Sequence, residues 1–259
     1  MNASTTPVVQ GPVALKNVAA FMAMTTRLIE RSHHLPGFGV CHGPSGYGKT
    51  YASIFAQNRT KAVRVEVGDS WTRRTLLRNI LRECGETVKD KWPISDLSDL
   101  AKSVLGENPS RPLIIDEADK LVDKGMIEIV RELQESSGAS VILIGEEKLP
   151  AKLLTVERMH NRVLHWFPAQ PCDLEDTQIL ARAFAPKVDI KDDLLEAICN
   201  RSNGRARRIV VNLDHAAEIA RNRNLRALDL KAWTGEFFTG EPPTPRHVEP
   251  YSRRAQKVA

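Results

Sequence analysis

The sequence has 259 residues, 42% hydrophobic and 27% charged, a balance typical of a folded chain and not of a disordered one. Thirty-seven Lys and Arg against 32 Asp and Glu give a net charge of +5, which is compatible with a polyanionic partner. The four cysteines stand singly at positions 41, 84, 172 and 199, which argues against a structural metal site. No apolar run approaches the roughly 20 residues of a membrane helix, and the first residues lack the pattern of a secretory signal. We therefore expect a cytoplasmic protein with no membrane contact.

Helices and strands are expected to alternate through the first two thirds of the chain. Apolar spacing predicts helices over residues 13–31, 49–57, 72–84, 96–105 and 125–136. Short apolar runs predict strands over 38–41, 62–67, 112–115 and 140–144, and a last helix-to-strand unit runs over 149–167. Short, continuously apolar strands separated by helices are typical of a parallel sheet covered on both faces. The sequence therefore predicts an α/β fold with a five-stranded parallel sheet.

The composition changes near residues 168–171, where the chain is rich in proline. Beyond that point, helices are predicted over 173–185, 191–200, 206–221 and 228–233, and no strand is convincing. The predicted divisions are an N-terminal extension (1–12), an α/β core (13–168), a helical lid (169–235) and a basic, proline-containing flexible tail (236–259). Within the tail, Phe237 and Phe238 are candidate anchors for a partner protein.

A phosphate-binding loop is the strongest functional signal in the sequence. Residues 43–50 fit the pattern G-x-x-x-x-G-K-[ST] at every defined position, between a predicted strand and a predicted helix. Glycines let backbone N–H groups turn toward phosphates at a helix N-terminus. Lys49 can reach the β- and γ-phosphates, and the Thr50 hydroxyl can bind Mg²⁺. The pattern therefore predicts binding of ATP and Mg²⁺ by Gly43, Pro44, Ser45, Gly46, Tyr47, Gly48, Lys49 and Thr50.

An acidic pair follows the strand predicted over 112–115. Asp116, at the C-terminal end of that strand, is expected to hold Mg²⁺ or its water shell. Glu117 is expected to orient and deprotonate an attacking water. An acidic helix cap within 116–119 is the structural alternative. Together with the phosphate loop, and with one strand inserted between the two motifs, the pair favours a water-activating ATPase over a small-molecule kinase.

Over residues 13–235 the chain resembles the AAA+ ATPases, whose parallel-sheet core is followed by a helical lid. The resemblance implies a polar sensor 1 residue after the fourth strand, a position that Glu146 occupies, where the family usually has Asn, Thr or Gln. It implies an arginine finger that completes the site of a neighbouring subunit. Arg162 fits best, and Arg158, one helical turn earlier, is the alternative. Sensor 2 falls within residues 205–208, with Arg207 as the first choice.

These arginines have a physical use in phosphoryl transfer. An arginine can stabilise charge that develops on the transferred group, and one supplied by a neighbour makes hydrolysis depend on assembly. A solvated helix face is the alternative for each of them.

Within the AAA+ ATPases, the sequence is most similar to transposition regulators of the MuB, TniB and TnsC type. The similarity rests on a small lid, on ILIG followed by EEKL at 142–149, and on the run WTRRTLLRNIL at 71–81. It implies an oligomer or helical filament on duplex DNA, delivery of the target site to a transposase, and disassembly driven by ATP hydrolysis. Helicase loaders of the IstB/DnaC type and secretion ATPases of the ExeA type share several of these features. An ATPase that acts on a protein partner therefore stays open.

A local excess of basic residues supports the DNA interpretation. Residues 59–91 contain nine Lys or Arg and five Asp or Glu, an excess of four out of the chain total of +5. Arginines spaced four apart would line one face of a helix, opposite Leu77, Ile80 and Leu81. Such a face can follow phosphates without reading bases, although a solvated basic face has the same pattern. The predicted DNA contacts are Arg73, Arg74, Arg78 and Arg82.

Overall fold

The computed structural model describes residues 15–89 and 91–242, and its centre is a five-stranded sheet. The strand order is β2-β3-β4-β1-β5 and every neighbouring pair is parallel. The predicted α/β fold is therefore confirmed, whereas the expected N-terminal extension (1–12) lies outside the described residues. The strands are β1 (Phe38–His42), β2 (Val63–Glu66), β3 (Leu113–Asp116), β4 (Val141–Gly145) and β5 (Val163–Pro168).

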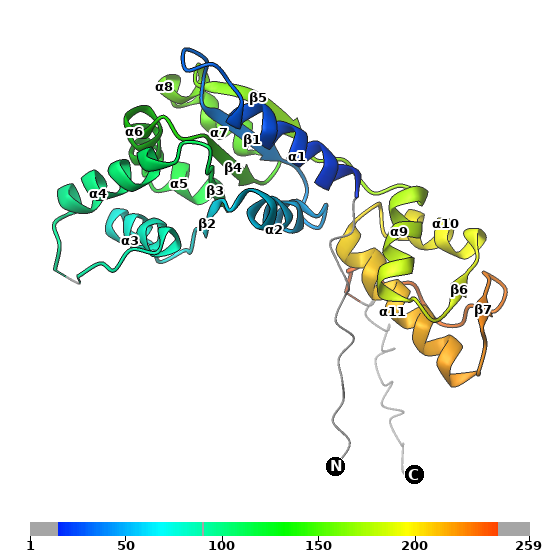
Figure 1. Ribbon diagram of the computed structural model, residues 1–259. Coiled ribbons are helices and arrows are strands. Elements are labelled where there is room, and N and C mark those ends of the chain that lie inside the picture. Colours follow the sequence, from blue (N-terminus) through cyan, green and yellow to red (C-terminus); the bar gives the residue numbers. More distant parts are fainter. Residues whose placement is uncertain (1–14, 90, 243–259) are drawn as a thin grey trace, which may run out of the picture.

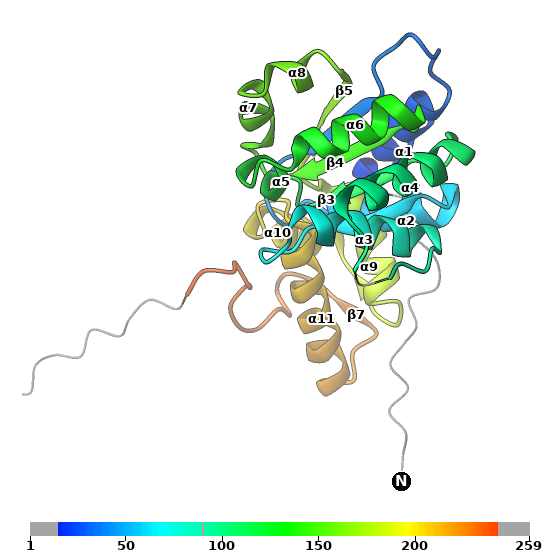
Figure 2. The ribbon, with the colours of Figure 1, turned by 90° about the vertical axis from the view of Figure 1, so that its left-hand side faces the viewer.

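Helices cover both faces of the sheet because successive residues of each strand point to opposite sides. In β3, Leu113 and Ile115 belong to the apolar layer beneath α3, α4 and α6, whereas Ile114 belongs to the layer beneath α1 and α2. Burial on both faces explains why the strands read as continuous apolar runs. Figure 2 shows α3, α4 and α6 in front of the sheet. The bounds are α1 (Lys16–Ile29), α2 (Lys49–Thr60), α3 (Arg73–Cys84), α4 (Ile94–Glu107) and α6 (Ile127–Ser137).

The helices after β5 gather at one end of the molecule (Figure 1). They are α9 (Leu174–Phe184), α10 (Asp192–Arg201) and α11 (Ala206–Asn222). Their buried residues, such as Leu180 and Leu213, join the same apolar cluster as Phe21 of α1. The carboxylate of Asp176 also accepts a hydrogen bond from the backbone N–H of Lys16 (3.0 Å), the first residue of α1. Shared burial and this hydrogen bond position these three helices, the predicted lid, next to α1.

Several short elements differ from the expectation. The C-terminal region contains a parallel pair of two-residue strands, β6 (Asp189–Ile190) and β7 (Ala227–Leu228), although the sequence predicted no strand there. The helix predicted over 228–233 is wrong: β7 is followed by a single turn in which Asp229 accepts from the backbone of Ala232. Two short helices, α7 (Leu149–Leu154) and α8 (Glu157–His160), precede β5, and α5 (Asp119–Asp123) directly follows the acidic pair.

The described start of the predicted tail packs on the lid. The side chain of Asn212, in α11, accepts from the N–H of Phe238 (2.8 Å) and donates to its carbonyl (3.0 Å). The rings of Phe237 and Trp233 are stacked with centroids 4.7 Å apart. Residues 237 and 238 of the predicted tail therefore contact α11 and Trp233, and the flexibility of the tail stays a prediction. The remainder of the predicted tail, 243–259, lies outside the described residues.

The described ranges contain no helix that combines the length and the apolar character needed to cross a bilayer. All four cysteines are free thiols, and Cys41, Cys172 and Cys199 are buried. Burial raises the pKa of the Cys41 thiol to about 12, an effect that nearby Lys49 opposes.

Candidate functional site

A cavity of about 510 Å³ lies where the phosphate loop meets the C-terminal ends of β3 and β4 and the helices α9 and α11. This is the edge of an open parallel sheet at which ligands generally bind. Four distant segments that the sequence singled out meet here. The predicted site residues in its lining are Ser45, Gly46, Gly48, Lys49, Thr50, Asp116, Glu117, Glu146 and Arg207.

The phosphate loop presents backbone N–H groups at the start of α2. Its glycines adopt positive φ angles (146° at Gly43, 90° at Gly46 and 82° at Gly48), a region that strains other residues. Gly48 is the N-cap of α2, and no side chain caps this helix. The N-cap residue therefore offers the first N–H groups of α2 no side-chain acceptor, and the helix dipole places positive charge at the same end.

The Lys49 ammonium lies over the loop. Its Nζ donates to the carbonyl oxygens of Gly43 (2.7 Å) and Pro44 (2.9 Å). Burial lowers the pKa of Lys49, although neighbouring acidic groups, including Asp116, oppose that effect. A partly buried ammonium group next to the N-terminus of a helix is suited to binding an anion.

The carboxylate of Asp116 is buried and both of its oxygens accept hydrogen bonds. Oδ1 accepts from the backbone N–H of Glu117 at 3.0 Å, and Oδ2 accepts from Nη2 of Arg64 at 2.8 Å. Arg64, in β2, also donates through Nε to Ser53 Oγ at 2.8 Å. Arg64 was counted in the local basic excess of residues 59–91, but its guanidinium is bound to Asp116 and Ser53. Arg64 alternates with the buried Val63 and Val65, a pattern that also fits an exposed side chain, so the pair with Asp116 could not be predicted from the sequence.

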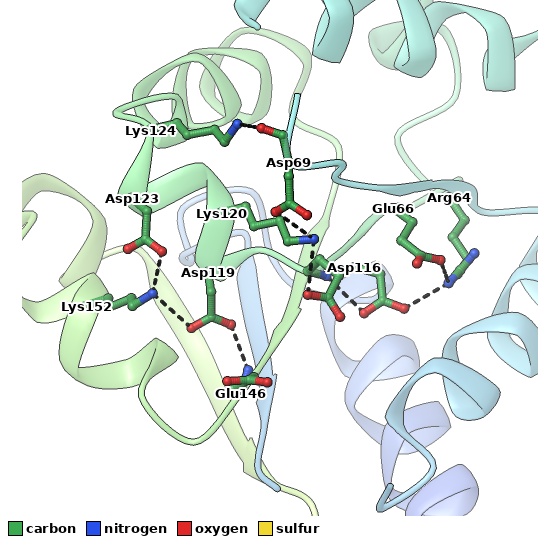
Figure 3. A network of polar contacts seen from close by, with 11 residues as sticks. Arg64, Glu66, Asp69, Asp116, Asp119, Lys120, Asp123, Lys124, Glu146 and Lys152 are labelled. Carbon is green, nitrogen blue, oxygen red and sulfur yellow. Dashed lines mark hydrogen bonds and ion pairs between the residues drawn. The ribbon is translucent and has the colours of Figure 1, made fainter. Parts of the chain in front are cut away.

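Glu117 lies beside Asp116 in a left-handed backbone conformation, with φ of 58°. Such a φ is uncommon for a residue with a side chain and is often found at functional sites. Its Oε2 is 3.7 Å from Nζ of Lys120, which in turn is 3.3 Å from Asp69. Lys124 also donates to the carbonyl of Asp69 (Figure 3). An ionic chain therefore runs from Glu117 to the loop that follows β2.

Glu146 is held by a residue that the sequence suggested only as a possible helix cap. The backbone N–H of Glu146 donates to Oδ2 of Asp119 at 2.7 Å. Oδ1 of Asp119 is 3.7 Å from Nζ of Lys152, which also pairs with Asp123. Figure 3 shows this second group of contacts next to the first. Asp119 therefore fastens the end of β4 to α5 and so positions Glu146 at the cavity.

Asn17 is a second contact that sequence reasoning missed. Its Nδ2 donates to the carbonyl oxygens of Tyr47 (2.8 Å) and Gln170 (2.7 Å), and its Oδ1 accepts from the N–H of Gln170 (3.0 Å). The side chain of this α1 residue is buried. One amide therefore joins the phosphate loop to the segment that leads into the lid. A polar residue on the apolar side of the predicted first helix was the available signal.

The three arginines near the start of α11 lie in different surroundings. Arg207 is exposed and lines the cavity. Arg205 lies against the phosphate loop, with its Cβ 3.4 Å from where a Cβ on Gly46 would be, and Arg208 lies against Gly240. This placement agrees with Arg207 as the first choice for sensor 2, and its role stays a prediction.

Apolar side chains form the rest of the cavity lining. Ile54, Phe184 and Val211 are among the few large hydrophobic residues that are exposed in the described chain, and all three face this cavity. Such a wall beside a phosphate-binding loop suits a ligand with one planar, weakly polar end and one anionic end. The other aliphatic lining residues are Leu15, Leu180, Ala206 and Val210.

The two candidate arginine fingers lie outside the cavity lining. Arg162, just before β5, forms an ion pair with Glu135 of α6 and donates to the carbonyl of Arg158 at 2.7 Å. Arg158 is exposed, and its guanidinium has no partner among the described residues. Neither arginine reaches the site of its own chain. Both assignments concern a neighbouring subunit and stay predictions.

The predicted DNA face of α3 is partly used by the chain itself. Leu77, Ile80 and Leu81 are buried as expected. The guanidinium of Arg74 donates to the carbonyl of Trp92, which leads into α4, and Arg78 is half-buried. Arg73 and Arg82 are exposed, and Arg73 makes a long contact of 3.5 Å with the carbonyl of Gly125. DNA contact through these four arginines stays a prediction.

Comparison with known proteins identifies the fold. Residues 32–153 match the model of a family described as an AAA domain, a span that includes the phosphate loop and Asp116. No curated protein sequence matches the chain.

Solved structures share the arrangement over most of the chain. The Aeropyrum pernix ORC2 protein, solved as ADPNP–ADP complexes, has a TM-score of 0.66 and 17% identity, over 83% of this chain and 65% of that one. Cdc6p from Pyrobaculum aerophilum has a TM-score of 0.58 and 16% identity, over 87% of this chain and 66% of that one. The A. pernix ORC1 protein, solved in complex with DNA, has a TM-score of 0.62 and 15% identity, over 86% of this chain and 64% of that one. The fold is that of a P-loop AAA+ NTPase. This chain spans just under two thirds of the length of these proteins, and at such identities the likeness is one of fold.

ATP and Mg²⁺ are the typical cofactors of AAA+ ATPases. The residues present fit both groups. The loop glycines, Lys49 and the N-terminus of α2 suit a polyphosphate. Thr50 and Asp116 both line the cavity and offer the oxygen ligands that Mg²⁺ prefers. Nowhere in the described ranges, the cavity included, do three or more His, Cys, Asp or Glu side chains form a group that could hold a metal ion by themselves.

Proposed function

We propose that this chain is an ATP-hydrolysing AAA+ ATPase that assembles on duplex DNA. The observation that carries the proposal is the convergence of the phosphate loop, two carboxylates and an arginine around one cavity. Each group matches one requirement of phosphoryl transfer to water: binding the phosphates, activating the nucleophile and stabilising the developing charge.

The residues divide these tasks between them. Backbone N–H groups of the loop and the Lys49 ammonium bind the phosphates, and the apolar wall that includes Phe184 accepts the base. Mg²⁺, when bound through Thr50 and Asp116, neutralises phosphate charge. Glu117 orients a water molecule and takes its proton, while Asp119 keeps Glu146 at the cavity edge. Arg207, from the start of α11, stabilises the charge that develops on the transferred phosphoryl group.

The finer proposal is that ATP-dependent assembly on DNA serves transposition. The sequence resemblance to transposition regulators supports it, as does the local basic excess at α3, of which Arg73 and Arg82 are exposed. One protein of similar fold was solved in complex with DNA. In this role the DNA-bound oligomer or filament presents a target site to a transposase, and hydrolysis takes the assembly apart. The transposition role also predicts a transposase gene next to the gene for this chain.

Binding to random duplex DNA tests the proposal. The full chain is examined by filter binding and electron microscopy with ATP, a non-hydrolysable ATP analogue or ADP, over a range of salt concentrations. We expect retention and ordered assemblies with the two triphosphates only, weakening as salt rises because phosphate contacts release counterions. The double variant Arg73→Gln, Arg82→Gln should lose retention. The matched control Arg221→Gln, Arg226→Gln removes two exposed arginines at and after the end of α11 and should leave retention unchanged. ATP hydrolysis without any DNA retention would refute DNA assembly and favour a protein partner, as for helicase loaders or secretion ATPases.

A further inference from the structure

The positively charged guanidinium of Arg64 lies against the carboxylate of Asp116, which the proposed function assigns as a ligand of the metal ion. Its Nη2 lies 2.8 Å from Oδ2 of Asp116. The pair is nearly enclosed, with 14% of the Arg64 side chain and 4% of the Asp116 side chain exposed. Figure 3 shows Arg64 reaching Asp116 from the neighbouring strand β2. This is possible because β2 pairs with β3 in a register that sets Glu66 opposite Asp116 and puts Arg64 two residues earlier on the same face.

Ser53 fixes the position of the guanidinium from the other side. Its hydroxyl accepts from Nε of Arg64 (2.8 Å) and donates to the carbonyl of Thr50 (2.7 Å), and Ser53 is fully buried. Thr50 and Asp116 are the two residues that fit Mg²⁺. One cation is therefore fastened to both elements that carry the metal ligands, α2 and β3. A third partner, Glu66 at 3.4 Å, is exposed and adds little.

The charge of Asp116 is thus already matched within the chain. Its Oδ1 accepts from the N–H of Glu117 and its Oδ2 from Arg64. A divalent cation that approaches this carboxylate also approaches a buried positive charge, and salt screens a buried pair only weakly. Metal binding at Asp116 must therefore either weaken its ion pair with Arg64 or proceed against the repulsion between the metal ion and the Arg64 guanidinium. By the same reasoning, Arg64 reduces the repulsion between Asp116 and the phosphates when no metal is bound.

We propose that Arg64 competes with the divalent cation for Asp116, and so makes metal binding weak and metal-free nucleotide binding strong. The inference rests on the proposed ATPase function, because it concerns the metal of that same site. Arg64 acts here as a positioning residue that determines the metal requirement of the site. It touches a metal ligand and takes no part in the bond-breaking step.

Two binding measurements on the full chain test this, and neither depends on turnover. The first is a Mn²⁺ titration followed by electron paramagnetic resonance in a saturating non-hydrolysable ATP analogue. The second is a titration with a fluorescent ATP analogue in excess EDTA. For Arg64→Gln we expect Mn²⁺ to bind more tightly by on the order of tenfold, while the metal-free nucleotide binds more weakly. Opposite shifts in the two affinities distinguish this role from general damage to the site, which would weaken both.

Further variants separate charge from packing. Arg64→Lys keeps the charge and should stay close to the original chain in both titrations. Ser53→Ala removes one anchor of the guanidinium, so Mn²⁺ should bind more tightly by a smaller factor than in Arg64→Gln. Arg221→Gln removes the same charge from an exposed position on α11 and should change neither affinity. Circular dichroism checks that each variant folds. If Arg64→Gln does not fold, the Mn²⁺ titration of Ser53→Ala decides the question.

The outcomes separate the two proposals. If the original chain binds no nucleotide with or without metal, the ATPase function fails. If the original chain binds nucleotide and Mn²⁺, but Arg64→Gln or Ser53→Ala leaves the Mn²⁺ affinity unchanged or lowers it, the competition is refuted and the ATPase function stands.

Discussion

Asp119 offers a direct test of how the end of β4 is held at the cavity. Its Oδ2 accepts the N–H of Glu146 at 2.7 Å, and 13% of its side chain is exposed. Alanine at this position removes a charge-assisted hydrogen bond worth about 1.5–3 kcal/mol and leaves the Glu146 amide without that acceptor. We therefore expect Asp119→Ala to lower the free energy of unfolding by about 2–3 kcal/mol. At about 2–4 °C per kcal/mol for a chain of this size, Tm should fall by about 4–12 °C.

The matched control is Asp123, the other acidic partner of Lys152. Its carboxylate lies 2.6 Å from Nζ of Lys152, but 55% of its side chain is exposed. A surface ion pair contributes about 0–1 kcal/mol, so Asp123→Ala should be nearly neutral. Urea unfolding followed by circular dichroism measures both variants, with equal slopes as the check that only stability changed. Asp119→Ala should also weaken nucleotide binding because Glu146 lines the cavity. Equal loss of stability in the two variants would refute the idea that the buried hydrogen bond holds β4.

Three further predictions concern the site and its surroundings. Glu117→Gln should retain ATP binding and trap long-lived assemblies, with single-turnover hydrolysis slower by about 10²–10⁴; brisk turnover would remove Glu117 as the base. Arg162→Ala should abolish assembly-stimulated hydrolysis while the isolated subunit still binds nucleotide in a fluorescence titration, and if Arg158→Ala does so instead, the finger lies one helical turn earlier. Because burial raises the pKa of Cys41 to about 12, its thiolate should be scarce at pH 8, and mass spectrometry should find it unmodified by iodoacetamide until the chain unfolds. The same shift should lower the free energy of unfolding as pH rises from about 9 to about 12, because only the unfolded chain then loses this proton; fast labelling of the native chain would contradict the shift.

The sheet and the phosphate loop could be predicted from the sequence for a local reason. A strand buried on both faces leaves an unbroken apolar run such as Val141–Gly145, and the helix between two such strands shows its own period. The loop that includes Lys49 is predicted to bind phosphate through consecutive backbone groups, so the residues that the prediction needs all lie within eight positions. Glu117 could be named because it lies two residues past the strand predicted over 112–115, next to Asp116. Glu146 was named from the resemblance to the AAA+ ATPases, in which this position follows the fourth strand.

Elements with weak periodicity could not be predicted in this way. Strands β6 and β7 are two residues long, too short for any alternation to show, and their pairing joins segments far apart in the chain. Residues 228–233 carry apolar residues at a spacing that also suits a helix, but the carboxylate of Asp229 bonds to the backbone of Ala232 and closes a single turn. Local hydrogen bonding by an aspartate competes with helix formation in this manner.

What the sequence determined by itself is therefore the fold class, the phosphate loop and the position of the two acidic residues after β3. Only the tertiary structure decided which polar groups meet. Arg64 reaches Asp116 across 52 positions and Asn17 reaches Gln170 across 153. Both meetings depend on which elements lie side by side: the register of β2 on β3 for the first, and the packing of α1 against the segment after β5 for the second. An enclosed charge must have a partner, and for Arg64 both the enclosure and the partner come from the neighbouring strand and helix, not from the local sequence.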